Sequence, residues 1–323
     1  MGSNGGQDLQ VLIERFEQGH ATAAARLITI LENGGEPAES VMDRIFPKAR
    51  GAYRIGFTGP PGAGKSSLVL HISQLLRRRD VQIGVIAVDP TSPFSGGALL
   101  GDRIRMQRLT GDPGVFVRSL ASRGSLGGIS NCTDEVADLL DAFGKEMILI
   151  ETVGVGQSEL EIAETTHTVV VILVPESGDG IQAMKAGLME IGDVFVMNKA
   201  DHPDSELAAK EIEDTLRLKN VPDGAWIPPV VLTSALEGRG IKELAESIEK
   251  HHRYLEEEDR LVEKRRRILR SRVRSAFMDR MERKIWDDPS VREILSERIG
   301  DVYEGRLSPY RLVQELEKRV KIE

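Results

Sequence analysis

The stretch that decides the fold is Gly59-Pro60-Pro61-Gly62-Ala63-Gly64-Lys65-Ser66. Its spacing is that of a phosphate-binding loop, in which Gly-x4-Gly-Lys-Ser joins a strand to a helix. The context agrees, because an apolar run at 54–58 precedes the loop and a helical pattern at 67–79 follows it. Backbone N–H groups of such a loop cradle the β-phosphate. We expect Lys65 to reach the β- and γ-phosphates and Ser66 to ligate Mg²⁺.

On both sides of this loop, over roughly residues 53–250, short apolar runs alternate with amphipathic stretches. This alternation predicts βα units around a parallel sheet, and runs that are apolar nearly throughout are typical of strands covered on both faces. The predicted fold class is α/β: a P-loop NTPase with a mostly parallel central sheet flanked by helices, plus helical N-terminal and C-terminal extensions. Strands are expected at 54–58, 83–88, 115–118, 147–151, 169–174, 194–198 and 230–233.

The two ends of the chain differ from this middle part. Between residues 9 and 31, apolar residues recur at three- and four-residue steps, which predicts two short helices. Residues 253–323 carry 19 Lys+Arg and 16 Asp+Glu, a net charge of +3, against −11 for the rest of the chain. We therefore expect an N-terminal helical extension at 1–50, a P-loop domain at 51–252 and a C-terminal helical arm at 253–323. A long helix with one apolar stripe is predicted in this arm from Leu261, Leu269, Val273, Phe277, Met281 and Ile285.

The composition of the whole chain indicates a globular protein. The 323 residues have a net charge of −8, 29% charged residues and 40% hydrophobic residues, which is ordinary for a globular enzyme. No apolar run approaches the roughly 18 residues of a membrane span. The single cysteine, Cys132, cannot form an internal disulfide and fits a reducing, cytoplasmic location. The basic run at 264–274 lacks interleaved aromatic residues and is flanked by acids, so a solvated or subunit-facing helix is favoured over nucleic-acid binding.

A second motif indicates which base is bound. Asn198-Lys199-Ala200-Asp201 stands at the end of the strand predicted at 194–198. A carboxylate here accepts two hydrogen bonds from the N1–H and 2-amino groups of guanine, which adenine does not offer in that arrangement. Thr233-Ser234-Ala235-Leu236, after the last strand, is the usual companion that closes over the O6 atom of the base. The ligand is therefore expected to be GTP or GDP. The predicted nucleotide-binding residues are Gly59, Gly62, Ala63, Gly64, Lys65, Ser66, Ser67, Asn198, Lys199, Asp201, Ser234, Ala235 and Leu236.

Further acids are expected near the phosphates. Glu151 ends the strand at 147–151 and is placed to orient the water shell of magnesium, while Gly154 offers its N–H to a γ-phosphate. We take Lys65, Glu151 and Gly154 as the catalytic set. Val155 stands where Ras-type GTPases carry a water-orienting Gln, so intrinsic hydrolysis is expected to be slow or to depend on a group supplied from elsewhere.

Two aspartates complete the predicted metal set of Ser66, Asp89, Asp102 and Glu151. Asp89 ends the strand at 83–88, whose carboxyl end should open on the phosphate crevice. A turn-forming role before Pro90 is its alternative. For Asp102, in the Gly-rich stretch 95–103, a turn or helix-start role competes evenly with metal binding.

The assembled motifs resemble those of the MeaB-like family of GTPases, which is associated with methylmalonyl-CoA mutase and related B12-dependent acyl-CoA mutases and is also called ArgK or lysine/arginine/ornithine transport ATPase. The resemblance covers about residues 7–320. The segments that carry it are 59–67, 88–92, 96–103, 151–159 and 198–201.

The resemblance implies a homodimeric G protein that binds the mutase, gates adenosylcobalamin delivery and protects or reactivates the mutase. It also implies a coupling loop between the nucleotide site and the partner, which matches residues 178–185 and contains Asp179, Gln182 and Lys185. Gly180 stands where the family often has an acid. The similarity is weakest beyond residue 253, although the apolar stripe there suits a dimerisation arm.

Two other functions remain as alternatives. An NTPase or kinase of lysine/arginine/ornithine transport is suggested by the older family name. A nickel-insertion GTPase would share the P-loop architecture, but the six histidines of the chain form no tract.

Overall fold

The computed structural model describes residues 4–89, 109, 111–121, 132–152, 158–175, 187–218, 222 and 224–319. The chain divides into two compact units, Met1–Val262 and Glu263–Glu323. The first contains the sheet and the phosphate-binding motif. The second contains most of one long helix and two shorter ones.

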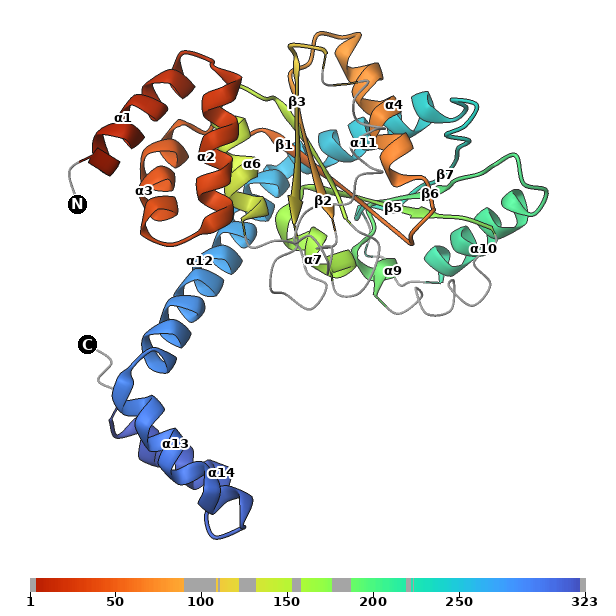
Figure 1. The fold of residues 1–323 in the computed structure, drawn as a ribbon. Helices are drawn as coiled ribbons and strands as arrows, with labels where there is room; N and C mark the ends of the chain where they lie inside the picture. The colour runs from red at the N-terminus through yellow and green to blue at the C-terminus, as the bar shows by residue number, and fades with distance from the viewer. Residues whose placement is uncertain are drawn as a thin grey trace. The chain divides into compact units, whose positions relative to one another are not determined.

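A seven-stranded parallel sheet forms the centre of the first unit (Figure 1). The strand order is β3-β2-β4-β1-β5-β6-β7, which confirms the predicted α/β fold class. Each predicted strand is present, with ends shifted by no more than three residues. The strands are β1 (Tyr53–Thr58), β2 (Ile83–Asp89), β3 (Val115–Ala121), β4 (Met147–Glu151), β5 (Thr168–Leu173), β6 (Val194–Met197) and β7 (Val230–Leu232).

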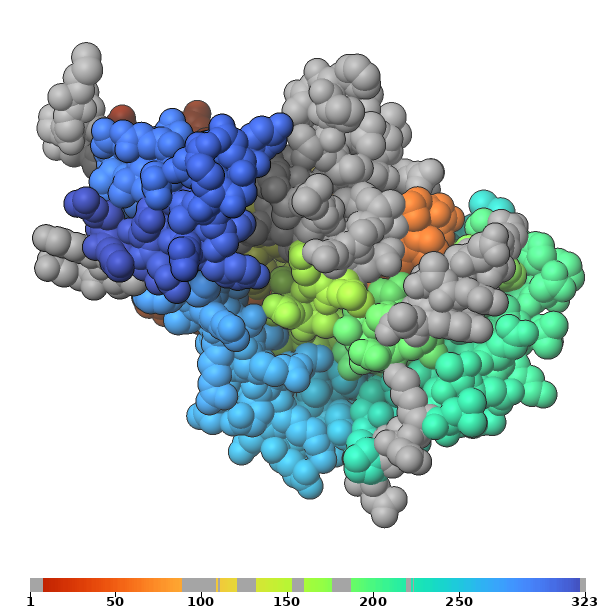
Figure 2. Space-filling model, turned by 90° about the horizontal axis from the view of Figure 1, so that it is seen from below, coloured from red at the N-terminus to blue at the C-terminus, as the bar shows by residue number. Residues whose placement is uncertain are grey.

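Helices cover both faces of the sheet, and this arrangement explains the apolar strands. On β5, Val170 and Ile172 pack into one core, whereas Val169 and Val171 pack into the other, as the two-residue period of a strand requires. The first core contains α4 (Lys65–Arg77) and α11 (Ile241–Glu256). The second contains residues of α6 (Thr133–Ala142), α7 (Ser158–Thr165), α9 (Leu188–Ile191) and α10 (Ser205–Arg217). Figure 2 shows α7 (yellow-green) beside α9 (green) on the surface of this unit, in agreement with their contact.

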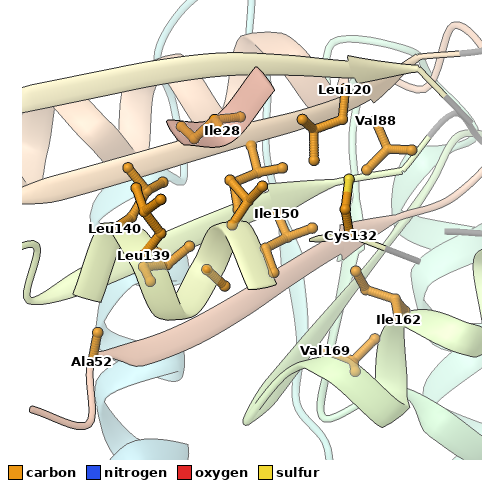
Figure 3. Packing of buried hydrophobic residues seen from close by; sticks show 14 of the residues in the cluster. Ile28, Ala52, Val88, Leu120, Cys132, Leu139, Leu140, Ile150, Ile162 and Val169 are labelled. Carbon is orange, nitrogen blue, oxygen red and sulfur yellow. The ribbon is translucent and has the colours of Figure 1, made fainter. Parts of the chain in front are cut away.

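Three N-terminal helices extend the second core. They are α1 (Asn4–Glu17), α2 (Ala21–Asn33) and α3 (Glu36–Ile45), so α3 adds to the two helices expected. Ile28 of α2 packs in one cluster with Leu139 and Leu140 of α6 (Figure 3). The thiol of Cys132 is buried in the same cluster (Figure 3).

One buried carboxylate joins these helices to the sheet. Asp141 of α6 is 4% exposed and accepts hydrogen bonds from the backbone N–H groups of Arg50, Gly51 and Ala52 at 2.8, 2.8 and 2.9 Å. These three residues lead from α3 into β1. The carboxylate therefore satisfies three consecutive backbone donors just before β1.

The long predicted helix is α12 (Arg260–Trp286), which begins in the first unit and continues into the second. Val291 of α13 (Pro289–Tyr303) and Leu312 and Leu316 of α14 (Pro309–Glu317) form the small core of the second unit, with Ile285 packed against it. Farther back on the stripe, Val273 and Phe277 are 70% and 59% exposed. Among the helices that the structure describes, none has the length and apolar character needed to cross a membrane.

Candidate nucleotide-binding site

The phosphate-binding motif lies between β1 and α4, and two of its glycines are required by close approaches. At Gly59, with φ of 138°, a Cβ atom would lie 2.1 Å from the carbonyl oxygen of Ile172 on β5. At Gly64, with φ of 94°, a Cβ atom would lie 2.3 Å from Nδ2 of Asn198. L-residues with side chains rarely adopt such angles. The loop is therefore seated directly against β5 and against the predicted base-binding motif.

Lys65 and Ser66 open α4, and both are buried. The Lys65 ammonium donates hydrogen bonds to the carbonyl oxygens of Gly59 at 2.8 Å and Pro60 at 3.0 Å. The Ser66 hydroxyl donates to Oε1 of Glu151 at 2.6 Å. The ammonium thus lies against the start of the loop, and the hydroxyl lies against the carboxylate that ends β4.

Strand order explains why Ser66 and Glu151 meet. β4 pairs with β1 in parallel, with Phe57 opposite Glu151, so both strands end at the same edge of the sheet. The backbone N–H of Thr152 donates to the carbonyl of Phe57 at 3.0 Å, which extends this pairing by one residue. β2 pairs with the other side of β4, with Ala87 opposite Glu151. Asp89, the last residue of β2, therefore belongs to the same edge. The structure describes its backbone and not its side chain.

The oxygen atoms at this edge suit a small divalent cation. Mg²⁺ prefers oxygen ligands, retains several waters and is usually held by one or two protein groups together with substrate phosphates. The Ser66 hydroxyl and the Glu151 carboxylate supply such a pair within hydrogen-bond distance of each other. No group of three His, Cys, Asp or Glu side chains suited to a metal occurs in the described ranges. The pair of Ser66 and Glu151 fits a cation whose remaining ligands come from phosphate and water.

Asn198 joins the phosphate loop to the loop after β7. Its side chain is 2% exposed, and its Nδ2 group donates to the carbonyl of Ala63 at 2.7 Å. Its Oδ1 atom accepts from the hydroxyl of Thr233 at 3.0 Å and from the backbone N–H of Ala235 at 3.1 Å. One amide therefore holds three segments that are far apart in the sequence.

The loop from Thr233 to Arg239, named here the base loop, is closed by its own backbone. Ser234 and Arg239 exchange two backbone hydrogen bonds, each 3.1 Å long. The hydroxyl of Ser234 donates to Oδ1 of Asp201 at 3.0 Å, and the Arg239 guanidinium donates to the carbonyl of Ala200 at 2.8 Å. Lys199 has a positive φ of 57°, which turns the chain between Asn198 and Asp201. Both halves of the predicted base-recognition motif are thus brought together.

The structure assembles most, but not all, of the predicted residues. Gly59, Gly64, Lys65, Ser66 and Glu151 meet at the phosphate end, while Asn198, Asp201, Ser234 and Ala235 meet at the base end. Leu236, by contrast, is 91% exposed. Gly154, Asp102, Asp179, Gln182 and Lys185 lie outside the described residues.

The sequence motifs mark neither of two residues that hold the base loop in place: Arg239, the last residue of the loop, and His71 of α4. Arg239 is the donor to Ala200 described above, and His71 of α4 lies 2.8 Å from the carbonyl oxygen of Ala235 through its Nε2 atom. No local pattern marks His71, because its partner is 164 residues away in the chain.

The parallel sheet, the glycine-rich loop between its first strand and first sheet-covering helix, and the acid at the neighbouring strand end define a P-loop NTPase. Comparison with known proteins identifies the family. The family model "Methylmalonyl Co-A mutase-associated GTPase MeaB" matches residues 24–290, and the chain belongs to this family of GTPases.

Individual relatives agree with this assignment. A protein of Pyrococcus horikoshii is 45% identical over 306 residues, covering 94% of this chain and 96% of its own. The mouse protein "Methylmalonic aciduria type A homolog, mitochondrial" is 32% identical over 322 residues, covering 94% of this chain and 77% of its own. A crystal structure described as a LAO/AO transport system kinase superposes with a TM-score of 0.73 at 27% identity, covering 96% of both chains.

Proposed function

We propose that this GTPase is a chaperone of a B12-dependent acyl-CoA mutase of the methylmalonyl-CoA mutase type, and that it uses GTP to gate adenosylcobalamin delivery and to protect or reactivate the mutase. The observation that carries the proposal is the match of residues 24–290 to a family described as mutase-associated. The mouse relative, whose name refers to methylmalonic aciduria, supports the same partner class. We further propose that the protein acts in the cytoplasm.

The geometry of the site supports specific roles for its residues. Lys65 exchanges its bonds to the Gly59 and Pro60 carbonyls for the β- and γ-phosphate oxygens of GTP, and the N–H groups of residues 62–67 receive the β-phosphate. Asp201 accepts from the N1–H and 2-amino groups of guanine. Asn198 holds the base loop and the phosphate loop at a constant separation through its three hydrogen bonds.

Magnesium, when bound, neutralises charge that develops on the phosphates. Ser66 would hold the ion directly, and Glu151, whose Oε1 atom lies 2.6 Å from the Ser66 hydroxyl, would orient waters bound to it. Asp89 and Asp102 are proposed to complete this environment, and the N–H of Gly154 to contact the γ-phosphate. Exchange of GTP for GDP then removes a charged group at this edge of the sheet, and such a change shifts loops that contact the γ-phosphate.

Two parts of the chain are proposed to carry the nucleotide state to other proteins. Asp179, Gln182 and Lys185 belong to the coupling loop toward the mutase. The C-terminal helices form the homodimer, and the exposed apolar side chains Val273 and Phe277 of α12 support this because their burial against a second copy would be favourable.

A second candidate function comes from the solved structure with a TM-score of 0.73, which is described as a transport system kinase. If this chain acts in the same way, the γ-phosphate passes to a protein or small acceptor. Hydrolysis to free phosphate distinguishes the chaperone from the kinase.

The test uses the purified full-length protein and methylmalonyl-CoA mutase from the same organism. We expect a complex in gel filtration whose stability differs between GDP and a non-hydrolysable GTP analogue, and a lower rate of mutase inactivation during turnover with GTP present. Lys65→Ala serves as the matched variant, because it removes the ammonium group proposed to contact the phosphates. The proposal fails if mutase inactivation and cofactor transfer are unchanged by GTP and no complex forms. Transfer of labelled γ-phosphate to an acceptor would support the kinase.

A further inference from the structure

His71 connects the helix that follows the phosphate loop with the loop that closes over the base. It lies in the second turn of α4, six residues after Lys65, and its Nε2 atom is 2.8 Å from the carbonyl oxygen of Ala235. A carbonyl oxygen can only accept a hydrogen bond, so Nε2 carries the proton and donates it. The imidazole therefore holds the base loop from the side of the phosphate-binding helix.

The Ala235 residue is held at both of its polar backbone groups. Its carbonyl accepts from His71, and its N–H donates to Oδ1 of Asn198 at 3.1 Å. Nδ2 of Asn198 in turn donates to the carbonyl of Ala63, which is two residues before Lys65. These contacts close a ring that runs from α4 to the base loop, to the end of β6 and back to the phosphate loop. Within a closed ring, the base loop cannot shift relative to the phosphate loop without breaking a hydrogen bond.

Apolar packing holds this loop only in part: the side chain of Ala235 is half-buried and packs against the core that contains α4 and α11. Leu236 is 91% exposed, so its side chain contributes little burial. The turn at Gly238 lies near the imidazole, since a Cβ atom added to Gly238 would lie 4.0 Å from Cε1 of His71. The hydrogen bonds from His71 and to Asn198 therefore act on Ala235 itself, in addition to its apolar packing and to the bonds of Ser234 and Arg239.

We propose that His71 is a positioning residue for guanine recognition, which places the backbone of Ala235 at the O6 edge of the base through the hydrogen bond from Nε2. The inference rests on the proposed guanine-binding role of Asn198, Asp201 and the base loop. Because the imidazole contacts the loop that closes over the base, we expect His71 to affect the affinity for GTP and GDP. The rate of hydrolysis at the γ-phosphate should stay unchanged.

Two substitutions of His71 distinguish the loss of its hydrogen-bond donor from the loss of its side-chain volume. His71→Leu removes the donor and retains a side chain of similar size, whereas His71→Gln restores an N–H group of comparable reach. For His71→Leu we expect GTP and GDP to bind roughly three- to tenfold more weakly, the effect of losing one neutral hydrogen bond. The kcat at saturating GTP is unchanged, and His71→Gln recovers most of the affinity. Gln74→Leu, which alters another half-buried polar side chain of α4, is the matched control and binds like the wild type.

The choice of nucleotides distinguishes this role from that of Asp201. ITP shares O6 with GTP and lacks the 2-amino group. We therefore expect His71→Leu to weaken the binding of GTP and of ITP to the same extent and to lower the preference for GTP over ATP. Asp201→Asn, measured in parallel, reduces the preference for GTP over ITP. If Asp201→Asn retains that preference, the proposed guanine site is wrong. If Asp201→Asn behaves as expected, the His71 inference is overturned by wild-type affinity in His71→Leu, by a loss of kcat there, or by failure of His71→Gln to restore binding.

Discussion

Replacing Asn198 with alanine tests the connection between the two halves of the nucleotide site. The side chain makes three hydrogen bonds, to Ala63, Thr233 and Ala235, at 2.7, 3.0 and 3.1 Å, and it is 2% exposed. A hydrogen bond between neutral groups contributes about 0.5–1.5 kcal/mol, and buried partners that lose their bond add to the cost. We therefore expect Asn198→Ala to lower the free energy of unfolding by about 2–4 kcal/mol.

Thermal unfolding of the nucleotide-free protein measures this change. For a unit of this size, a loss of 1 kcal/mol lowers Tm by about 2–4 °C, so a decrease of roughly 5–15 °C is expected. Binding of fluorescent GDP should also weaken, because the base loop and the phosphate loop are no longer joined. An unfolding free energy within about 0.5 kcal/mol of the wild type, a change typical of surface substitutions, would refute the reasoning.

Thr233→Val provides the control, because it removes one of the three bonds and preserves the shape of the side chain. Alone it should cost about 1 kcal/mol. The double variant Asn198→Ala/Thr233→Val should lose about 1 kcal/mol less unfolding free energy than the two single variants lose in sum. The reason is that both single variants remove the same Thr233–Asn198 hydrogen bond. Full additivity would show that this hydrogen bond does not contribute to stability.

Three further predictions concern other parts of the first unit. Asp141→Ala removes the acceptor for the backbone N–H groups of residues 50–52. It should lower the unfolding free energy, measured by urea denaturation, by about 3–5 kcal/mol. A loss below about 1 kcal/mol would contradict this. Gly59→Ala places a Cβ atom 2.1 Å from the Ile172 carbonyl and should abolish tight GTP binding in a fluorescence titration, whereas Gly62→Ala, where nothing lies within 4 Å, should be milder. The Arg77 guanidinium, hydrogen-bonded to Asp112 at 3.0 Å, holds the pKa of that carboxyl below its usual value. Because this pKa is lowered in the folded state, the stabilisation is present above about pH 4 and is lost as the pH falls through the folded pKa. Urea midpoints of Asp112→Asn and wild type should therefore differ at pH 7 and converge in acid, and a constant difference would refute this assignment.

The central strands β1, β5 and β6 could be predicted well because the side chains of each are buried on both faces of the sheet. β3 shows where this reasoning is incomplete. Its apolar run ends before Arg118, yet the strand continues to Ala121, because β3 remains paired with β2 and the Arg118 guanidinium forms an ion pair with Glu32 of α2. A charged residue inside a strand is acceptable when another element supplies its partner.

The N-terminal helices show a similar limit. α3 follows two glycines, carries Pro37 in its first turn and was not predicted as a separate helix. Its buried residues Ala38, Val41 and Ile45 pack into the core shared with α6. Packing against distant helices, which no local pattern contains, stabilises this short segment.

The local parts of the site could be recognised from neighbouring residues alone. The spacing from Gly59 to Ser66 specifies a strand, a tight loop and a helix, since positive φ angles and the helix N-terminus depend on consecutive residues. The motif from Asn198 to Asp201 was likewise identifiable before its surroundings were known. The tertiary structure decided which of these segments meet. The order β4-β1-β5-β6 places Glu151 beside Ser66 and Asn198 beside Ala63. The contact of His71 with Ala235 also depends on α4 and the base loop packing together, because a hydrogen bond between residues 164 apart leaves no periodic trace in the sequence.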